Sequence, residues 1–219
     1  EPVTLNYDDA SWSSVNLPNG IEYLPEEASG GINYQGEVWY RKHFIPKDSL
    51  ADKKMFLHFE AIMGKSKIWL NGTLLKTTYG GYLPIVIDIT EHINLKKDNV
   101  ITVWADNSDD PSYPPGKEQD LLDFTYFGGI YRDCWLITHT KTYITNANHE
   151  DIPAGGGLLV AYKNVSENSA DIILNLHTNN EINKKFHGYI EYDFVSSEGK
   201  RVTKEKIPLS INSESDTTT

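Results

Sequence analysis

Apolar and polar residues alternate with a period of two along most of this 219-residue chain. No helical repeat of 3.6 residues persists over a long stretch. The clearest case is Ile68-Trp69-Leu70, which is followed by Asn71-Gly72 and then by Thr73-Leu74-Leu75. Asn-Gly favours a two-residue β-hairpin turn, because both of its positions adopt positive φ. The pattern therefore predicts an all-β fold built from short strands.

Further runs rich in aromatic and β-branched residues are bounded by turn residues, and we expect them to be strands. They are residues 38–44, 55–59, 100–105, 158–162, 170–176 and 188–194. Many short strands separated by regular turns are typical of a β-sandwich or a jelly roll. The only helical signal is a single turn over residues 88–93, opened by Asp88 or Thr90 as a cap.

The residue composition changes between residues 140 and 157, which are mostly polar and end in three glycines. We therefore predict two domains, residues 1–140 and residues 141–219. The second is shorter than the roughly 100 residues of an immunoglobulin-like sandwich. We expect it to be truncated at its C-terminal end and to lack one or two strands.

The formal net charge of −11 argues against nucleic acid and against an anionic membrane surface as partners, because both would repel the chain. The sequence has no run of about 18 apolar residues, so it predicts no membrane-spanning helix. The only cysteine, Cys134, lies in the apolar run Cys-Trp-Leu-Ile and is expected to be a buried hydrophobe. A lone cysteine and the absence of a starting methionine favour a periplasmic or secreted setting.

Local motifs for common active sites are absent: no Gly-x-Ser-x-Gly, phosphate-binding or dinucleotide glycine pattern occurs. The seven histidines are scattered without the spacing of a transition-metal site. Carboxylates concentrate at residues 106–110 and at Asp120 and Asp123. Oxygen ligands of this kind suit a hard cation, and a solvated acidic loop is the alternative.

The segment 108–129 is a long irregular connection between two expected strands. Loops of this length are usually functional or disordered. This one combines aromatic rings, including Phe124 and Tyr126, with the carboxylates of Asp120 and Asp123. Rings that stack on CH groups and carboxylates that accept from hydroxyls suit a hydroxyl-rich ligand. Packing against a neighbouring domain is the alternative, and the two are compatible.

Gly128 and Gly129 end this segment directly before an apolar strand. They permit a close or positive-φ backbone where the loop re-enters the sheet. The next charged residues, Arg132 and Asp133, are expected to form a local ion pair that holds the loop.

Six motifs occur in a fixed order over residues 8–138: D-D-A-S-W-S-S-V-N-L-P (8–18), G-E-V-W-Y-R-K-H-F (36–44), I-W-L-N-G (68–72), G-G-Y-L-P-I-V-I-D-I-T (80–90), N-V-I-T-V-W-A-D-N (99–107) and G-G-I-Y-R-D-C-W-L (128–136). Together they resemble the N-terminal sugar-binding domain of glycoside hydrolase family 2, which includes β-galactosidases, β-glucuronidases and β-mannosidases. The bacterial β-galactosidase branch is most similar, through D-F-T-Y-F-G-G-I-Y-R-D.

The resemblance implies a galactose-binding-domain-like jelly-roll β-sandwich followed by a partial immunoglobulin-like β-sandwich. It also implies a retaining glycosidase whose two catalytic glutamates lie in a later (β/α)₈ barrel. This chain has no such barrel, so we expect no catalytic residues in it and no hydrolysis by it alone. Its expected partners are a carbohydrate substrate and the catalytic barrel, and a homo-oligomer is left open.

In β-galactosidases of this family, an aspartate shortly before the G-I-Y-R-D motif contacts sugar hydroxyls and helps to hold a cation. The matching position here is Asp123, which is thus a candidate for substrate binding and for a Na⁺, Mg²⁺ or Ca²⁺ ligand in the full-length enzyme. Asn33 matches an asparagine with a similar role. Phe124, Tyr126 and Asp120 complete the candidate substrate-binding set.

Two other hypotheses stand beside the one that this chain is an accessory portion of a family 2 glycosidase. One is a self-sufficient carbohydrate-binding module, since jelly rolls often bind sugars. The other is a purely structural or interaction domain. Sugar binding by the isolated chain would favour the module.

Overall fold

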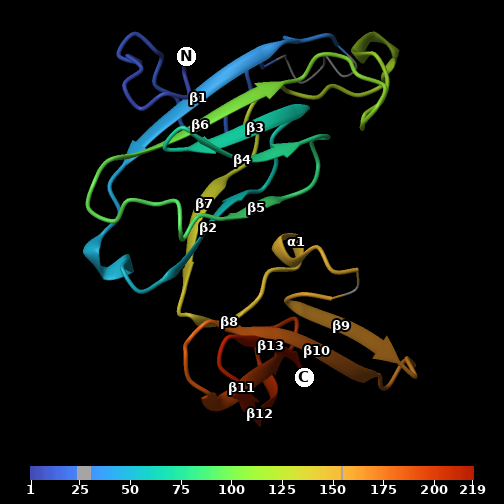
Figure 1. Cartoon of the computed structure of the whole chain (residues 1–219). Coiled ribbons are helices and arrows are strands. Elements are labelled where there is room, and N and C mark those ends of the chain that lie inside the picture. The colour runs from blue at the N-terminus through green and yellow to red at the C-terminus, as the bar shows by residue number, and fades with distance from the viewer. Residues whose placement is uncertain (24–30, 154) are drawn as a thin grey trace. The chain divides into compact units, whose positions relative to one another are not determined.

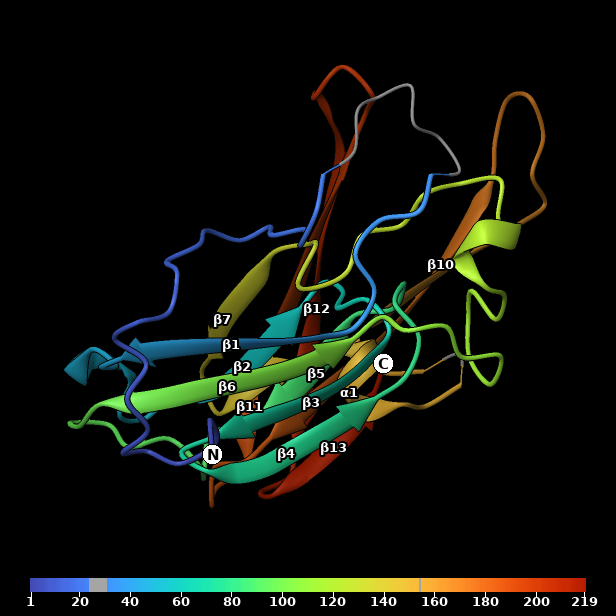
Figure 2. The same cartoon turned by 90° about the horizontal axis from the view of Figure 1, so that it is seen from above.

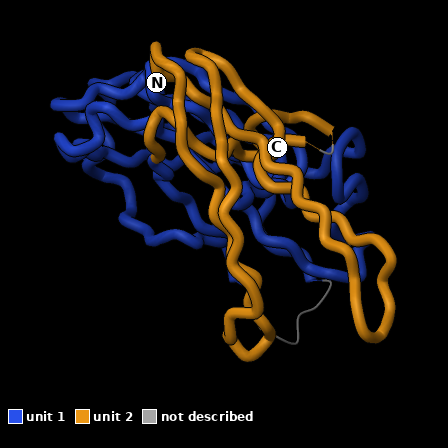
Figure 3. Tube along the Cα trace, turned by 90° about the horizontal axis from the view of Figure 1, so that it is seen from below, with its two compact units in different colours: residues 1–138 blue, residues 139–219 orange. Residues whose placement is uncertain are grey.

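The structure is a computed structural model that describes residues 1–23, 31–153 and 155–219. The chain forms two compact units, Glu1–Thr138 and His139–Thr219, which Figure 3 colours blue and orange. Both units are built from β-strands in antiparallel sheets, so the predicted all-β class is confirmed. The limits of the two functional domains, 1–140 and 141–219, stay predictions.

The described residues of the first unit form two sheets (Figures 1 and 2). The four-stranded sheet has the order β1 (Glu37–Phe44), β6 (Asn99–Asp106), β3 (Lys65–Leu70) and β4 (Thr73–Thr78). The three-stranded sheet has the order β5 (Ile85–Asp88), β2 (Lys54–Phe59) and β7 (Cys134–His139). This pair of sheets is the expected jelly-roll β-sandwich.

The core of the first unit lies between these sheets, because alternate residues of each strand point inward. In β3, Ser66, Ile68 and Leu70 are buried, whereas Lys65, Lys67 and Trp69 are only partly covered. Seven buried apolar residues of β2, β5 and β6 belong to the same cluster, together with Ile62 and Ile130: Met55, Leu57, Phe59, Ile85, Ile87, Val103 and Ala105. The period-two pattern in the sequence is therefore the pattern of core burial.

The predicted Asn-Gly hairpin is confirmed as the turn between β3 and β4. Asn71 has φ 54° and Gly72 has φ 83°, the left-handed values that such a turn requires. Asn71 also binds the neighbouring strand, because its Oδ1 accepts from the Val100 N–H at 3.0 Å and its Nδ2 donates to Asn99 Oδ1 at 2.9 Å. This side chain links the hairpin to the start of β6.

Helical structure is confined to short pieces in the described residues. These are η1 (Asp48–Leu50), η2 (Gln119–Leu121) and α1 (Ala147–Glu150), none of which the sequence pattern singled out. The predicted helical turn at residues 88–93 is a non-helical turn. Its cap is nevertheless as expected, since Asp88 Oδ1 accepts from the Thr90 N–H at 3.0 Å.

The described residues of the second unit form six strands of the expected immunoglobulin-like β-sandwich, and its truncation at the C-terminal end stays a prediction. They are β8 (Thr142–Ile144), β9 (Leu158–Lys163), β10 (Asp171–Asn180), β11 (Phe186–Val195), β12 (Arg201–Ile211) and β13 (Ser215–Thr218). The long strand β10 pairs with β9 along its first part and with β8 and β13 along its last part. β11 and β12 form a two-stranded sheet.

Candidate functional site

The connection between β6 and β7 follows Asn107, which is 3% exposed and ties two segments together. Its Nδ2 donates to the main-chain oxygen of Tyr34 at 2.8 Å, and its Oδ1 accepts from the Gly36 N–H at 3.0 Å. A buried amide that uses both of its ends fixes the position of both partners. The segment before β1 is therefore anchored to the start of the long loop.

A second amide pair continues this anchoring deeper in the loop. Asn33 is 6% exposed and Gln119, at the start of η2, is 1% exposed. The Asn33 N–H donates to Gln119 Oε1 at 2.6 Å, and Gln119 Nε2 donates back to Asn33 Oδ1 at 2.9 Å. Asn33 Nδ2 also donates to the main-chain oxygen of Tyr126 at 2.7 Å. In this arrangement the Asn33 side chain supports the loop from beneath, and its role as a sugar contact stays a prediction.

Tyr126 lies in the same buried layer and is 6% exposed. Its hydroxyl donates to Asp109 Oδ1 at 3.4 Å, and this carboxylate oxygen also accepts from Gln35 Nε2 at 2.6 Å and from the Gln119 N–H at 3.1 Å. Burial raises the pKa of Tyr126 above its ordinary value. Tyr126 therefore packs under the loop, and its use as a ring platform for sugar stays a prediction.

The exposed surface of the loop contains the other candidates. Asp120, Asp123 and Phe124 are all exposed, and Phe124 shows 43% of its surface. Asp123 and Phe124 line an open hollow with a volume of about 670 Å³. The rest of its lining comes from the same loop and from the turn between β4 and β5: Tyr82, Pro115, Lys117, Leu121 and Leu122. Asp120 lies on η2 and does not line this hollow.

The structure thus sorts the predicted residues into two layers. Asn33 and Tyr126 form the buried support, and Asp123 and Phe124 reach the surface beside Tyr82 and Lys117. The hollow offers two aromatic rings, a carboxylate that accepts hydrogen bonds and an ammonium that donates them. This combination suits a ligand with apolar CH faces and many hydroxyl groups.

The carboxylates at residues 106–110 are used for the loop itself. Asp106 Oδ1 accepts from the Ser108 N–H at 2.9 Å, and Asp110 Oδ1 accepts from the Ser112 N–H at 2.8 Å. Within the described ranges, no three His, Cys, Asp or Glu side chains are grouped as a metal site would require. These residues alone do not form a cation site, and Asp123 as a cation ligand stays a prediction that needs ligands from elsewhere.

The two glycines at the end of the loop make the close backbone approach that was predicted. Gly129 has φ +94°, and a Cβ there would lie 2.3 Å from the Tyr40 hydroxyl. A Cβ on Gly128 would lie 2.7 Å from Asn107 Nδ2. The carbonyl of Gly129 accepts from the Met63 N–H at 3.0 Å, which returns the chain to the sandwich.

The expected ion pair between Arg132 and Asp133 is wrong. No ion pair joins these two described residues, and the Arg132 guanidinium lies over the ring of Tyr131, 5.9 Å from its centroid. The main-chain oxygen of Asp133 accepts from the Glu60 N–H at 2.9 Å. Arg132 and Asp133 lie in the irregular segment before β7, and there the Arg132 guanidinium packs on the neighbouring Tyr131 ring instead of meeting the Asp133 carboxylate.

Cys134 packs against the core of the first unit as a small hydrophobe, but it is only partly buried rather than fully buried as predicted. Burial raises the pKa of its thiol to about 12. A thiol with this pKa is almost fully protonated near neutral pH and is a poor nucleophile. The residue is a small hydrophobe at the start of β7.

Sequence reasoning missed Gln119, Gln35, Tyr82 and Lys117. Gln119 and Gln35 are polar residues in irregular segments, where no periodic pattern marks a buried position. Tyr82 and Lys117 come together from two separate loops. Their only signal in the sequence was the turn before β5 and the length of the loop before β7.

Comparison with known proteins identifies the family. Residues 4–140 match the family described as glycosyl hydrolases family 2, sugar binding domain. A β-galactosidase of Thermoanaerobacter pseudethanolicus is 34% identical over 141 residues, which are 64% of this chain and 19% of that protein. A β-glucuronidase of Formosa agariphila is 30% identical over 192 residues, which are 81% of this chain and 19% of that protein.

Solved structures support the fold. A β-glucuronidase of Bacteroides uniformis superimposes with a TM-score of 0.82 at 23% identity, over 100% of this chain and 25% of that one. The chain spans about a fifth of the length of the curated relatives named above. None of the described helices is long and apolar enough to cross a membrane. The match over residues 4–140 shows that this chain belongs to glycoside hydrolase family 2 and contains the sugar-binding domain of that family.

Proposed function

We propose that this chain is the non-catalytic N-terminal portion of a β-galactosidase that removes terminal β-linked sugars from oligosaccharides with retention of configuration. Two glutamates of a barrel domain outside this chain would act as nucleophile and acid/base through a covalent glycosyl intermediate. The chain alone is expected to be inactive. Its contribution is one wall of the substrate site.

The hollow beside Asp123 is the observation that carries the proposal. An exposed carboxylate and the rings of Phe124 and Tyr82 line it, above a loop held by buried amides. Asp123 would accept hydrogen bonds from sugar hydroxyls, and the rings would contact the CH faces of the sugar. A preorganised loop adds affinity because little conformational entropy is lost on binding.

A β-glucuronidase is the second candidate. The Formosa agariphila relative is similar over a larger share of this chain than the β-galactosidase is. A self-sufficient carbohydrate-binding module remains the alternative outside enzymes. These three readings differ in which sugar is bound and in whether the chain binds it alone.

The first experiment is a titration of the 219-residue chain with galactose, lactose and glucuronate, followed by NMR chemical shifts. If the chain provides only one wall of the site, shifts at Asp123 and Phe124 are expected to be weak and not to saturate at millimolar sugar. Saturation at or below millimolar concentration would support the module and contradict the proposal.

The second experiment introduces Asp123→Asn into the full-length enzyme and measures kcat/KM on aryl β-galactoside and β-glucuronide. Loss of a hydrogen-bonded charge predicts a fall of about tenfold to hundredfold. Asp52→Asn is the control, because Asp52 is an exposed aspartate in the turn after η1. An unchanged kcat/KM in Asp123→Asn would show that this carboxylate does not contact the substrate.

A further inference from the structure

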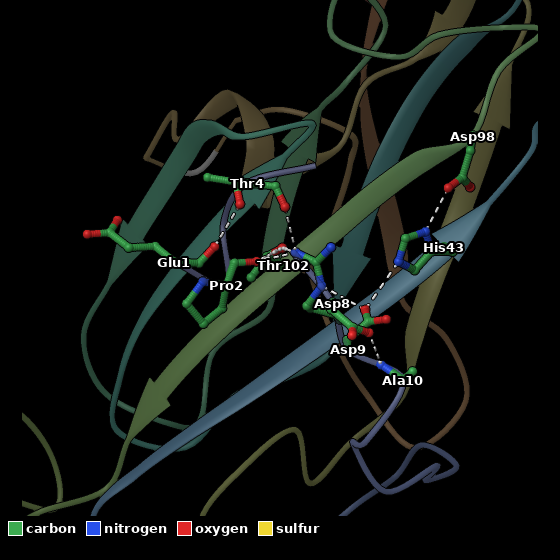
Figure 4. Close-up of polar contacts among 10 residues, drawn as sticks. Glu1, Pro2, Thr4, Asp8, Asp9, Ala10, His43, Asp98 and Thr102 are labelled. Atoms are coloured by element: carbon green, nitrogen blue, oxygen red, sulfur yellow. Dashed lines mark hydrogen bonds and ion pairs between the residues drawn. The ribbon is translucent and has the colours of Figure 1, made fainter. Parts of the chain in front are cut away.

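The first residues of the chain, 1–12, form neither strand nor helix and enclose a buried cation on the outer face of β1. The side chain of Arg41 is 1% exposed, and its Nε donates to Asp9 Oδ2 at 2.8 Å. Its Nη1 donates to the main-chain oxygens of Pro2 and Thr4, the latter at 3.3 Å (Figure 4). These residues, 1–12, are named the N-terminal segment below.

The opposite side of Arg41 is covered by the same segment and by the sheet. The Tyr7 ring lies 5.5 Å from the guanidinium carbon, a cation–π distance. Thr102 Oγ1 on β6 accepts from Arg41 Nη1 at 3.3 Å. Arg41 is therefore removed from water only while the N-terminal segment stays in place, and Asp9 is the anion that offsets its buried charge.

His43 lies two positions further along β1 and so points to the same face. Its Nδ1 is 2.6 Å from Asp98 Oδ2, and its Nε2 is 3.2 Å from Asp9 Oδ2 (Figure 4). Asp9 belongs to the N-terminal segment, and Asp98 precedes β6. The imidazole thus lies between carboxylates from two separate parts of the chain.

This geometry requires a charged imidazole. A neutral histidine has one N–H donor and one lone pair, whereas both ring nitrogens of His43 face a carboxylate oxygen. Only the imidazolium donates to both. Loss of the proton would direct a lone pair at one carboxylate and remove the attraction to the other.

The charged groups around the ring are accounted for within the described residues. Asp9 and Asp98 contact it, and Arg41 beside it is paired with Asp9. Asp8 accepts from the Ala10 N–H at 3.0 Å, so it caps the segment itself. The Glu1 side chain points away from His43 in Figure 4.

We propose that His43 holds the N-terminal segment in place in a pH-dependent way. The imidazolium bonds both Asp9 and Asp98 and so keeps the segment over Arg41, and loss of its proton loosens the segment. None of the three residues in this contact lines the hollow beside Asp123. The proposal is therefore independent of which sugar the enzyme cleaves.

The direction of the pH dependence follows from the two carboxylates. The hydrogen bond to Asp98 and that to Asp9 raise the pKa of His43 above 6.5, against the effect of burial. This attachment of the segment is complete below pH 6.5 and is lost as the pH rises through the raised pKa of His43. In acid it persists until Asp9 is protonated, and the hydrogen bond from Arg41 lowers the pKa of Asp9 below 3.8.

The test is an NMR titration of the 219-residue chain from pH 5 to pH 9, observing the His43 ring and the amides of Tyr7, Asp9 and Ala10. The His43 midpoint is expected above 6.5, and the segment amides are expected to change with the same midpoint. Each unit by which the midpoint exceeds 6.5 corresponds to about a tenfold larger opening constant at high pH. Cleavage by chymotrypsin at Tyr7 and Trp12, followed by mass spectrometry, reports the same opening.

Two variants keep the proposal falsifiable. His43→Gln retains a polar side chain of similar reach without a charge, and His43 is 43% exposed in its side chain, so the variant is expected to fold. Its segment should be cleaved at the same rate as wild type at pH 9 and several-fold faster at pH 6. Asp98→Asn should lower the His43 midpoint. A midpoint at or below 6.5, or an unchanged titration of the segment amides in His43→Gln, would overturn the proposal.

Discussion

Asn33 and Gln119 exchange two hydrogen bonds across 86 positions of sequence, one at 2.6 Å and one at 2.9 Å, and both residues are buried. The pair holds the segment before β1 against the loop that carries Asp123. Because the pair is buried, neither amide can replace a lost partner with bulk water. The position of the surface loop is therefore fixed from below.

Gln119→Ala is expected to lower the free energy of unfolding by about 1–3 kcal/mol, because it leaves the Asn33 N–H and Oδ1 unpaired. Urea denaturation measures the loss, and hydrogen exchange of the Asn33 amide should accelerate in the variant. The exposed neighbour Glu118 provides the control as Glu118→Ala. Equal stability of the two variants would show that the amide pair does not hold the loop.

Gly129→Ala tests the close approach of the loop to β1. The left-handed backbone at φ +94° disfavours alanine by about 1–2 kcal/mol. The new Cβ would also lie 2.3 Å from the Tyr40 hydroxyl, which adds about 1–3 kcal/mol of overpacking. Thermal and urea unfolding should both show the loss.

Gly80→Ala is the matched control for this substitution. Gly80 has φ +105°, but nothing lies within 4 Å of its Cβ position. The control variant shows the backbone cost alone, so the difference between the two variants measures the steric contacts at Gly129, of which the Tyr40 hydroxyl is the nearest. Equal losses would contradict the steric argument.

Cys134 is expected to react very slowly with a thiol reagent in the native chain. With a pKa of about 12, about 0.01% of the thiol is ionised at pH 8, and only the thiolate reacts. Because the native pKa is raised, the stability that the partly buried thiol contributes falls as the pH rises above about 9. Ellman's reagent at pH 8, with and without urea, measures this, and labelling at equal rates would show that Cys134 is accessible.

Phe124→Ala is expected to weaken sugar binding by the full-length enzyme without lowering its stability. The ring is 43% exposed, so its removal opens no core cavity, and a stacking contact contributes about 0.5–1.5 kcal/mol, or about two- to tenfold in KM. Tyr162→Ala, at an exposed ring of β9, is the control. A KM that is unchanged in both variants would exclude Phe124 from the sugar contact.

The fold was predictable where it follows local patterns. The Asn71-Gly72 turn and the alternation in β3 depend on φ preferences and on the two-residue period of a strand. β12 was missed because its sequence R-V-T-K-E-K-I-P-L-S-I contains many charges, and most of it is exposed. A strand without a buried face has no hydrophobic alternation to detect.

The candidate site was predictable only in part, because its residues meet through the tertiary fold. The loop between β6 and β7 was identified by its length and its mixture of rings and carboxylates. Its two layers were not, since burial of Tyr126 depends on Asp109 and Gln35 rather than on neighbouring residues in the sequence. The wrong ion pair of Arg132 and Asp133 has the same origin, because adjacency in sequence does not specify side-chain direction.

In the second unit, three strands all pair with the same strand, β10. Residues 171–176 of β10 pair with β9, and residues 177–180 pair with β13. The last three residues of β10 also pair with β8. In the part of this unit that the structure describes, none of these three strands has another partner in its sheet. Detachment of β10 would therefore release all of them together, so these strands are expected to unravel and reassemble as one cooperative block.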